Sequence, residues 1–131
     1  MASILKVDTL TGVTTAGSIS VTGEGNSTTT NLQQGLAKAF IVGTDAAGIT
    51  NSLNVGSGTD NGTGNYSYSY VNNMANSNWC FSGASEVEAR MLTINSSNVA
   101  KDSNGFDVKL YTHAGNEDDR SHGGQIHGDL A

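Results

Sequence analysis

The sequence lacks proline, has a single cysteine, and carries only six basic residues in 131. A lone cysteine cannot form a disulfide within the chain, so the fold must be held by its core or by other chains. Because Cys80 lies between Trp79 and Phe81, we predict a buried, unreactive thiol. The basic residues are scattered and the formal net charge is −6, so we expect no nucleic-acid binding.

Long apolar runs are also absent. No run approaches the roughly 18 to 20 residues that span a bilayer, and the start, MASILKVD, lacks the basic region and apolar core of a signal peptide. We therefore expect no membrane insertion. Ile, Leu, Val and Phe together make up about one residue in five, which is low for a globular domain, so a monomer would be marginally stable.

The sequence is instead rich in Gly, Ser, Thr and Asn, and it contains 17 glycines. Only 14% of the residues are charged, which differs from the usual composition of disordered segments. Residues of these types favour turns and short strands, in which backbone hydrogen bonds replace much of the burial of a thick core. The composition predicts a mainly β protein whose strands can pair between copies.

Residues 1–44 predict an N-terminal β-arm and a short helix. ILKVDTL and SISVTGEG alternate as short strands do, and in NLQQGLAKAFIVG (31–43) Leu32, Leu36 and Phe40 recur every four residues, as on one face of a helix. We predict a helix of about three turns over 31–42. Such a helix is not stable alone in water, so we expect it to pack on other copies or on the chain's own sheet. The predicted oligomer interface consists of Ile4, Leu5, Val7, Ile19, Val21, Leu32, Leu36 and Phe40.

Residues 45–131 predict a small, jelly-roll-like antiparallel β-sandwich with a polar C-terminal tail. Five strand patterns follow one another at spacings of about ten residues with no helix between them, and Asn61-Gly62 is a strong hairpin signal. The patterns are SLNVGSG, NYSYSYV, NWCFSG, VEARMLTI and FDVKLYT. The last twenty residues lose this periodicity, so we interpret them as a tail or as a segment that wraps a neighbouring copy.

Two groups of residues are candidates for ligand binding. Tyr66, Tyr68 and Tyr70 share one strand face, and together with Asp60 and Asn61 they form a possible receptor surface, because aromatic rings with polar tips stack on sugars. The alternative is that these rings form the inner face of the sandwich. The histidines His113, His122 and His127 are weak metal candidates on a three-fold axis, against the alternative of a solvated tail.

Patterns typical of catalysis are missing from the sequence. It contains no G-x-S-x-G motif, and the glycine clusters GEG and GSGTDNGTG precede turns or strands, whereas phosphate-binding loops precede a helix. We therefore expect no enzyme and no cofactor.

The segments MASILKVDTLTGVTTAGSISVTGEG and TTTNLQQGLAKAFI resemble the N-terminal region of small tail-fibre-like structural proteins of marine and cyanobacterial tailed phages. SLNVGSGTDNGTGNYSYSYVNNMANSNWCFSGAS is similar to a β-rich module of such fibres. The resemblance covers residues 1 to about 85. It implies a noncatalytic virion protein, assembled in the host cytoplasm as an intertwined homotrimer, with the arm in anchoring or trimer formation and the sandwich facing outward.

The resemblance leaves two functions open. One is a receptor-binding or tail-fibre module, in which the loops at 60–64 and 95–104 contact a host surface glycan. The other is a capsid decoration protein that stabilises or ornaments the head. The expected partners are further copies of the chain and other virion proteins of the tail or capsid, with the glycan added in the first case.

Overall fold

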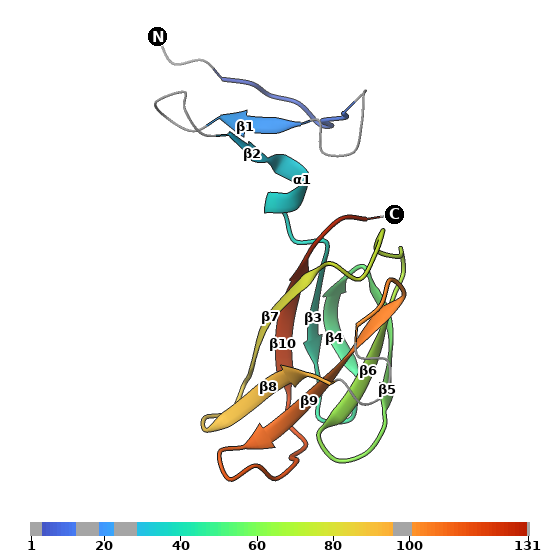
Figure 1. The fold of residues 1–131 in the computed structure, drawn as a ribbon, viewed down its shortest axis with the longest axis vertical. Coiled ribbons are helices and arrows are strands. Elements are labelled where there is room, and N and C mark those ends of the chain that lie inside the picture. Colours follow the sequence, from blue (N-terminus) through green and yellow to red (C-terminus); the bar gives the residue numbers. More distant parts are fainter. Residues whose placement is uncertain (1–3, 13–18, 23–28, 96–100, 131) are drawn as a thin grey trace. The chain divides into compact units, whose positions relative to one another are not determined.

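The computed structural model describes residues 4–12, 19–22, 29–95 and 101–130 (Figure 1). The chain forms two compact units, Met1–Leu36 and Ala37–Ala131. This division precedes the predicted boundary between residues 44 and 45, because the strand at 39–43 belongs to the second unit.

The N-terminal unit contains a two-stranded antiparallel sheet and one helical turn. Strand β1 (Ser20–Thr22) pairs with β2 (Thr29–Asn31), and α1 (Leu32–Gly35) follows directly. The backbone N–H of Leu32 donates to the carbonyl oxygen of Ile19 at 2.8 Å. The strand predicted in SISVTGEG is confirmed at residues 20–22, while residues 18 and 23–25 lie outside the described residues. The strand predicted in ILKVDTL is wrong, since residues 4–12 form no regular element.

The predicted three-turn helix over 31–42 is also wrong. Helix α1 ends at Gly35, and Phe40 lies in strand β3 (Ala39–Gly43), not on a helical seam. Glycine inside a helix costs about 1 kcal/mol relative to alanine, and a helix this short is marginal in water. The aromatic and β-branched run Phe40-Ile41-Val42 suits a strand, and β3 pairs with strands on both of its sides.

The second unit is a small β-sandwich of two four-stranded antiparallel sheets. Sheet I has the strand order β4-β3-β10-β7, and sheet II has the order β5-β6-β9-β8. The remaining strands are β4 (Ile49–Leu53), β5 (Val55–Asp60), β6 (Asn65–Tyr70), β7 (Cys80–Ser85), β8 (Arg90–Ile94), β9 (Gly105–Thr112) and β10 (His122–His127).

Short turns carry the chain along and between the sheets. Asn54, with a φ of 57°, is the single residue between β4 of sheet I and β5 of sheet II. The hairpin predicted at Asn61-Gly62 is confirmed: Asp60 pairs with Tyr66, and Gly62 has a φ of +119° that favours glycine.

The predicted polar tail is wrong for residues 122–127. They form β10, which lies inside sheet I and pairs with β3 on one side and with β7 on the other. The sequence HGGQIH hides its alternation because two of its six residues have no side chain. Its inward positions include His122 and Ile126, which are both about 1% exposed.

The core between the sheets is largely aromatic. The ring of Phe106 on β9 lies 5.4 Å from Tyr68, 5.7 Å from Tyr70, 5.8 Å from Phe81 and 6.2 Å from Trp79, measured between centroids. Phe81 belongs to sheet I and Phe106 to sheet II, so this contact joins the two sheets.

Cys80 is exposed, and the prediction of a buried thiol is wrong. Its neighbours Trp79 and Phe81 both pack against Phe106. Successive side chains of a strand point to opposite faces, so the residue between these two rings points outward.

Candidate functional site

The three tyrosines of the predicted receptor surface lie in the core. Tyr66 is 0% exposed, Tyr68 2% and Tyr70 7%, so their rings offer no face on which a sugar could stack. The alternative prediction, that the three rings form the inner face of the sandwich, is confirmed. Burial raises the pKa of all three phenols above the ordinary value, which keeps them neutral.

A buried polar pair lies among these rings. The Tyr68 hydroxyl is 2.9 Å from Nε2 of His122, and Nδ1 of His122 is 2.9 Å from the carbonyl oxygen of Arg120. Because a carbonyl oxygen only accepts, Nδ1 donates, and in the neutral ring Nε2 accepts from Tyr68. The Tyr66 ring stacks on the imidazole with centroids 4.9 Å apart.

Asp119 extends this buried network towards the β5–β6 turn. Its Oδ1 accepts from the backbone N–H of Gly64 at 2.6 Å and from the Tyr66 hydroxyl at 2.9 Å. These hydrogen bonds, first the one from Gly64, lower the pKa of Asp119 and keep it charged. This network was not predictable from the sequence, because Gly64, Tyr66 and Tyr68 lie more than fifty positions before Asp119 and His122.

The three candidate metal ligands are not brought together within one chain. His122 is buried with both ring nitrogens hydrogen-bonded, His113 is exposed after β9, and His127 ends β10. No group of three or more His, Cys, Asp and Glu side chains that could hold a metal ion occurs in the described part of the chain. The solvated-tail alternative is wrong for His122, whose desolvated ring has a lowered pKa.

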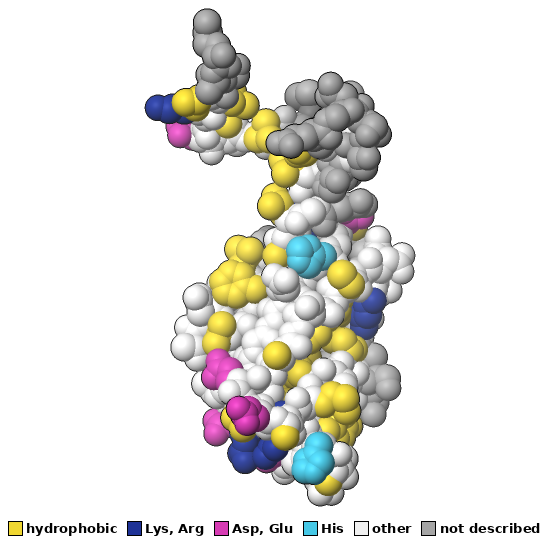
Figure 2. Space-filling view, turned by 90° about the vertical axis from the view of Figure 1, so that its left-hand side faces the viewer, with side chains coloured by type: hydrophobic (Ala, Val, Ile, Leu, Met, Phe, Trp, Pro, Cys, Tyr) yellow, Lys and Arg dark blue, Asp and Glu magenta, His cyan; other side chains and the backbone are white. Residues whose placement is uncertain are grey.

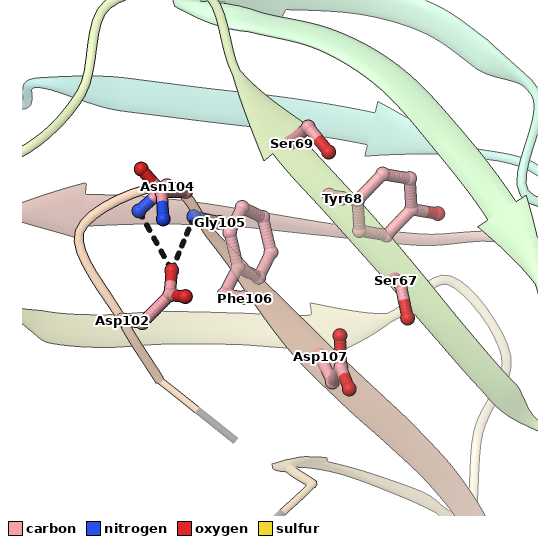
Figure 3. Close-up of a pocket in the computed structure, with 8 residues that line it drawn as sticks. All are labelled: Ser67, Tyr68, Ser69, Asp102, Asn104, Gly105, Phe106 and Asp107. Atoms are coloured by element: carbon pink, nitrogen blue, oxygen red, sulfur yellow. Dashed lines mark hydrogen bonds between the residues drawn. The ribbon is translucent and has the colours of Figure 1, made fainter. Parts of the chain in front are cut away.

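A pocket of about 260 Å³ lies at β6 and β9 of sheet II and at the turn before β9 (Figure 3). It is lined by Ser67, Tyr68, Ser69, Asp102, Asn104, Gly105, Phe106 and Asp107. Asp102 turns its carboxylate toward the backbone, and its Oδ1 accepts from the N–H groups of Asn104 at 2.6 Å and of Gly105 at 2.8 Å. The pocket lining includes two serine hydroxyls, the Asn104 amide and the Asp102 carboxylate, which are groups that hydrogen-bond a hydroxyl-rich ligand, whereas Asp107 is only 2% exposed.

Only part of the predicted receptor surface contributes to this pocket. Asp102 and Asn104 belong to the predicted loop at 95–104, of which residues 96–100 lie outside the described residues. Asp60 ends β5 and Asn61 follows it in the β5–β6 turn, and both are exposed. Asp60 accepts from the N–H of Gly62 at 2.9 Å, and the Asn61 amide donates to Ser67 at 2.6 Å. These two residues therefore shape the hairpin turn.

Charged side chains gather around the segment after β9. Asp118 forms ion pairs with Arg90 and with Arg120, and Lys109 pairs with Glu117. Figure 2 shows one side of the molecule, on which acidic and basic side chains gather mainly toward the lower end of the sandwich. These pairs are partly exposed, so each contributes little to stability.

The predicted interface residues of the N-terminal unit are mostly exposed. Five of its apolar side chains from the predicted set are more than half exposed: Ile4 (77%), Leu5 (80%), Val7 (57%), Val21 (52%) and Leu36 (55%). Ile19 and Leu32 are partly buried. Phe40 is partly buried as well, but in sheet I of the sandwich.

Comparison of the chain with protein-family models, curated proteins and solved structures gave no match. Among the described residues, no helix is both long enough and apolar enough to cross a bilayer.

Proposed function

We propose that this chain is a noncatalytic structural protein of a phage virion, a tail-fibre-like receptor-binding module that assembles as a homotrimer. In this proposal the arms of three copies intertwine, and the jelly-roll-like sandwiches face outward. The resemblance of residues 1 to about 85 to tail-fibre-like proteins is the sequence support for it.

One observation carries the proposal: the N-terminal unit exposes its apolar side chains. Leu10, which was not in the predicted set, is 57% exposed and joins the five residues given above. Fully burying a side chain of this size contributes roughly 1.5–3 kcal/mol. A segment with this many exposed apolar groups gains its stability from another surface, and copies of the same chain supply that surface symmetrically.

The pocket of sheet II supports the receptor-binding role. It combines the hydroxyls of Ser67 and Ser69 with the carboxylate of Asp102 and the amide of Asn104. A host surface glycan presents matching hydroxyl groups. The other function, capsid decoration, requires no such pocket.

Two measurements test the proposal. Light scattering should give a mass of three times 13.5 kDa for the full chain. A label on the protein in intact virions should then mark a few copies confined to the tail. A monomer at all concentrations would rule out the assembly, and a dense array over the head would replace the tail-fibre role with capsid decoration.

A binding assay on immobilised host surface polysaccharides tests the receptor role itself. Ser69→Leu fills the pocket with an apolar side chain, whereas Ser57→Leu places the same side chain on the neighbouring strand, outside the pocket lining. We expect only Ser69→Leu to reduce binding. Equal binding by wild type and both variants would exclude the pocket as the glycan site.

A further inference from the structure

The four strands of sheet I contain no Asp, Glu, Lys or Arg; their titratable side chains are Cys80, His122 and His127. Strands β3, β4, β7 and β10 read AFIVG, ITNSL, CFSGAS and HGGQIH, whereas sheet II carries Asp60, Arg90, Asp107 and Lys109. The outward face of sheet I carries the side chains of Phe40, Val42, Asn51, Leu53, Cys80, Ser82, Ala84, Gln125 and His127. Leu53 is 48% exposed on this face.

The middle of this face has a shallow hollow that is open to solvent. This hollow, of about 430 Å³, lies over β3, β10 and β7, with Phe40 on one side and Ser82 and Ala84 on the other. At its centre, a Cβ added to Gly123 would meet only the carbonyl oxygen of Ile41, at 3.3 Å. Glycine within a strand often marks a place where another backbone approaches closely.

The charge of the chain indicates what approaches this face. With a net charge of −6, two copies repel each other, and the repulsion is weakest where the facing surfaces carry no charged side chains. The cores of protein–protein interfaces are depleted in charged residues, as this face is. A nucleic acid or an oppositely charged protein would be held by Lys, Arg, Asp or Glu side chains, and the four strands of this face have none of them.

The area of the face indicates that it does not act alone. Four strands about 4.8 Å apart, each of five or six residues at about 3.3 Å per residue, cover roughly 350 Å². A stable interface buries about 800 Å² on each partner. The face therefore covers less than half of the area of a stable interface, and other surfaces of the assembly must supply the rest.

We propose that the outward face of sheet I packs against a second copy of this chain, as the sandwich part of the interface of the homo-oligomer. This inference rests on the proposed function, because it needs the same assembly. It adds a surface that the arm and helix do not include.

A matched pair of substitutions tests the proposal. Ser82 and Ser57 are both exposed and outward-facing, Ser82 on β7 of sheet I and Ser57 on β5 of sheet II. In the assembled protein, Ser82→Glu would place an unpaired carboxylate between two copies. We expect this to raise the dissociation constant of the oligomer at least about tenfold, measured by concentration-dependent light scattering. Ser57→Glu should leave it unchanged.

The single cysteine gives a second readout that needs no substitution. Cys80 lies two residues before Ser82 and is exposed in the single chain. Its reaction with a thiol reagent should slow at least about tenfold when wild-type protein is concentrated enough to assemble, and dilution should restore the rate.

The outcomes separate this inference from the proposed function. The inference is overturned if the Ser82→Glu variant keeps the oligomer mass of the wild type and Cys80 of the wild type reacts equally fast at every concentration. The assembly proposed above would then still stand. A wild-type chain that stays monomeric overturns both. Circular dichroism checks that Ser82→Glu keeps the β fold.

Discussion

The Tyr68 hydroxyl and Nε2 of His122, 2.9 Å apart, link the two sheets of the sandwich through a hydrogen bond inside the core. Tyr68 comes from β6 of sheet II and His122 from β10 of sheet I, and both are at most 2% exposed. The bond fixes the imidazole as a neutral acceptor at Nε2. It therefore makes the folded state sensitive to protonation of one ring.

Stability should fall when the solution becomes acidic, because of His122. Burial lowers its folded pKa below the unfolded value of about 6.5, so the unfolded chain takes up a proton more readily. The unfolding free energy is then unaffected above about pH 6.5 and decreases below it, by up to about 1.4 kcal/mol per pH unit per proton. Denaturant unfolding between pH 8 and pH 5 measures this change.

The control for this pH dependence is the exposed histidine of the β9 turn. His113→Gln should keep the acid-side loss, whereas His122→Gln should reduce it. A His122→Gln protein with the wild-type slope would show that other groups cause the acid sensitivity.

Removing the hydroxyl of Tyr68 should lower the free energy of unfolding, whereas removing that of Tyr70 should not. Tyr68→Phe leaves the Nε2 acceptor of His122 buried without a donor, at a cost of about 1–3 kcal/mol. The Tyr70 hydroxyl is buried with no hydrogen-bond partner in the described structure, so Tyr70→Phe should be neutral or stabilising. Urea unfolding of the two variants measures the difference, and equal losses would contradict this account of the core.

Truncating the central ring should nearly unfold the sandwich. Phe106 is 1% exposed and contacts four other aromatic rings. Phe106→Ala removes these contacts and leaves a cavity, which costs about 3–5 kcal/mol. Met91, which is 56% exposed, is the control, since Met91→Ala should change stability by no more than about 0.5 kcal/mol. Thermal unfolding monitored by tryptophan fluorescence compares the two variants.

The sequence predicted those strands in which apolar and polar side chains alternate visibly. NYSYSYV marks β6 clearly, and Asn61-Gly62 marks its hairpin with β5. Strand β10 was missed because Gly123 and Gly124 have no side chains, so the sequence shows no alternation of apolar and polar residues there. Strand β3 was missed because the spacing of Leu36 and Phe40 also fits a helix, and pairing with β4 and β10 decides between the two.

The candidate site was less predictable than the fold. Serines and acids of a turn-rich chain are too common to single out, and Ser67 meets Asp107 only through the pairing of β6 with β9. The tyrosines were visible in the sequence, but alternation alone does not say which face of a strand is covered. The absence of Asp, Glu, Lys and Arg from the segments that form sheet I was also visible in the sequence. It indicates an uncharged surface only once these four separate strands are known to form one sheet.

The last prediction concerns the N-terminal unit. Leu36 is 55% exposed in the single chain, so Leu36→Asp costs a monomer little, within about 0.5 kcal/mol. In a homo-oligomer that buries Leu36, the same substitution places an unpaired carboxylate in an apolar interface. Light scattering should then show monomers at concentrations at which the wild type is assembled.

The sandwich supplies the matched control, since Val71 is 65% exposed and lies outside both proposed contact surfaces. Val71→Asp should keep the wild-type mass. The melting temperature separates the causes further, because loss of assembly lowers it in a concentration-dependent way, whereas damage to a monomer does not. An unchanged mass and melting temperature for Leu36→Asp would exclude Leu36 from the interface and leave the arm residues Ile4, Leu5 and Val7 as the next to substitute.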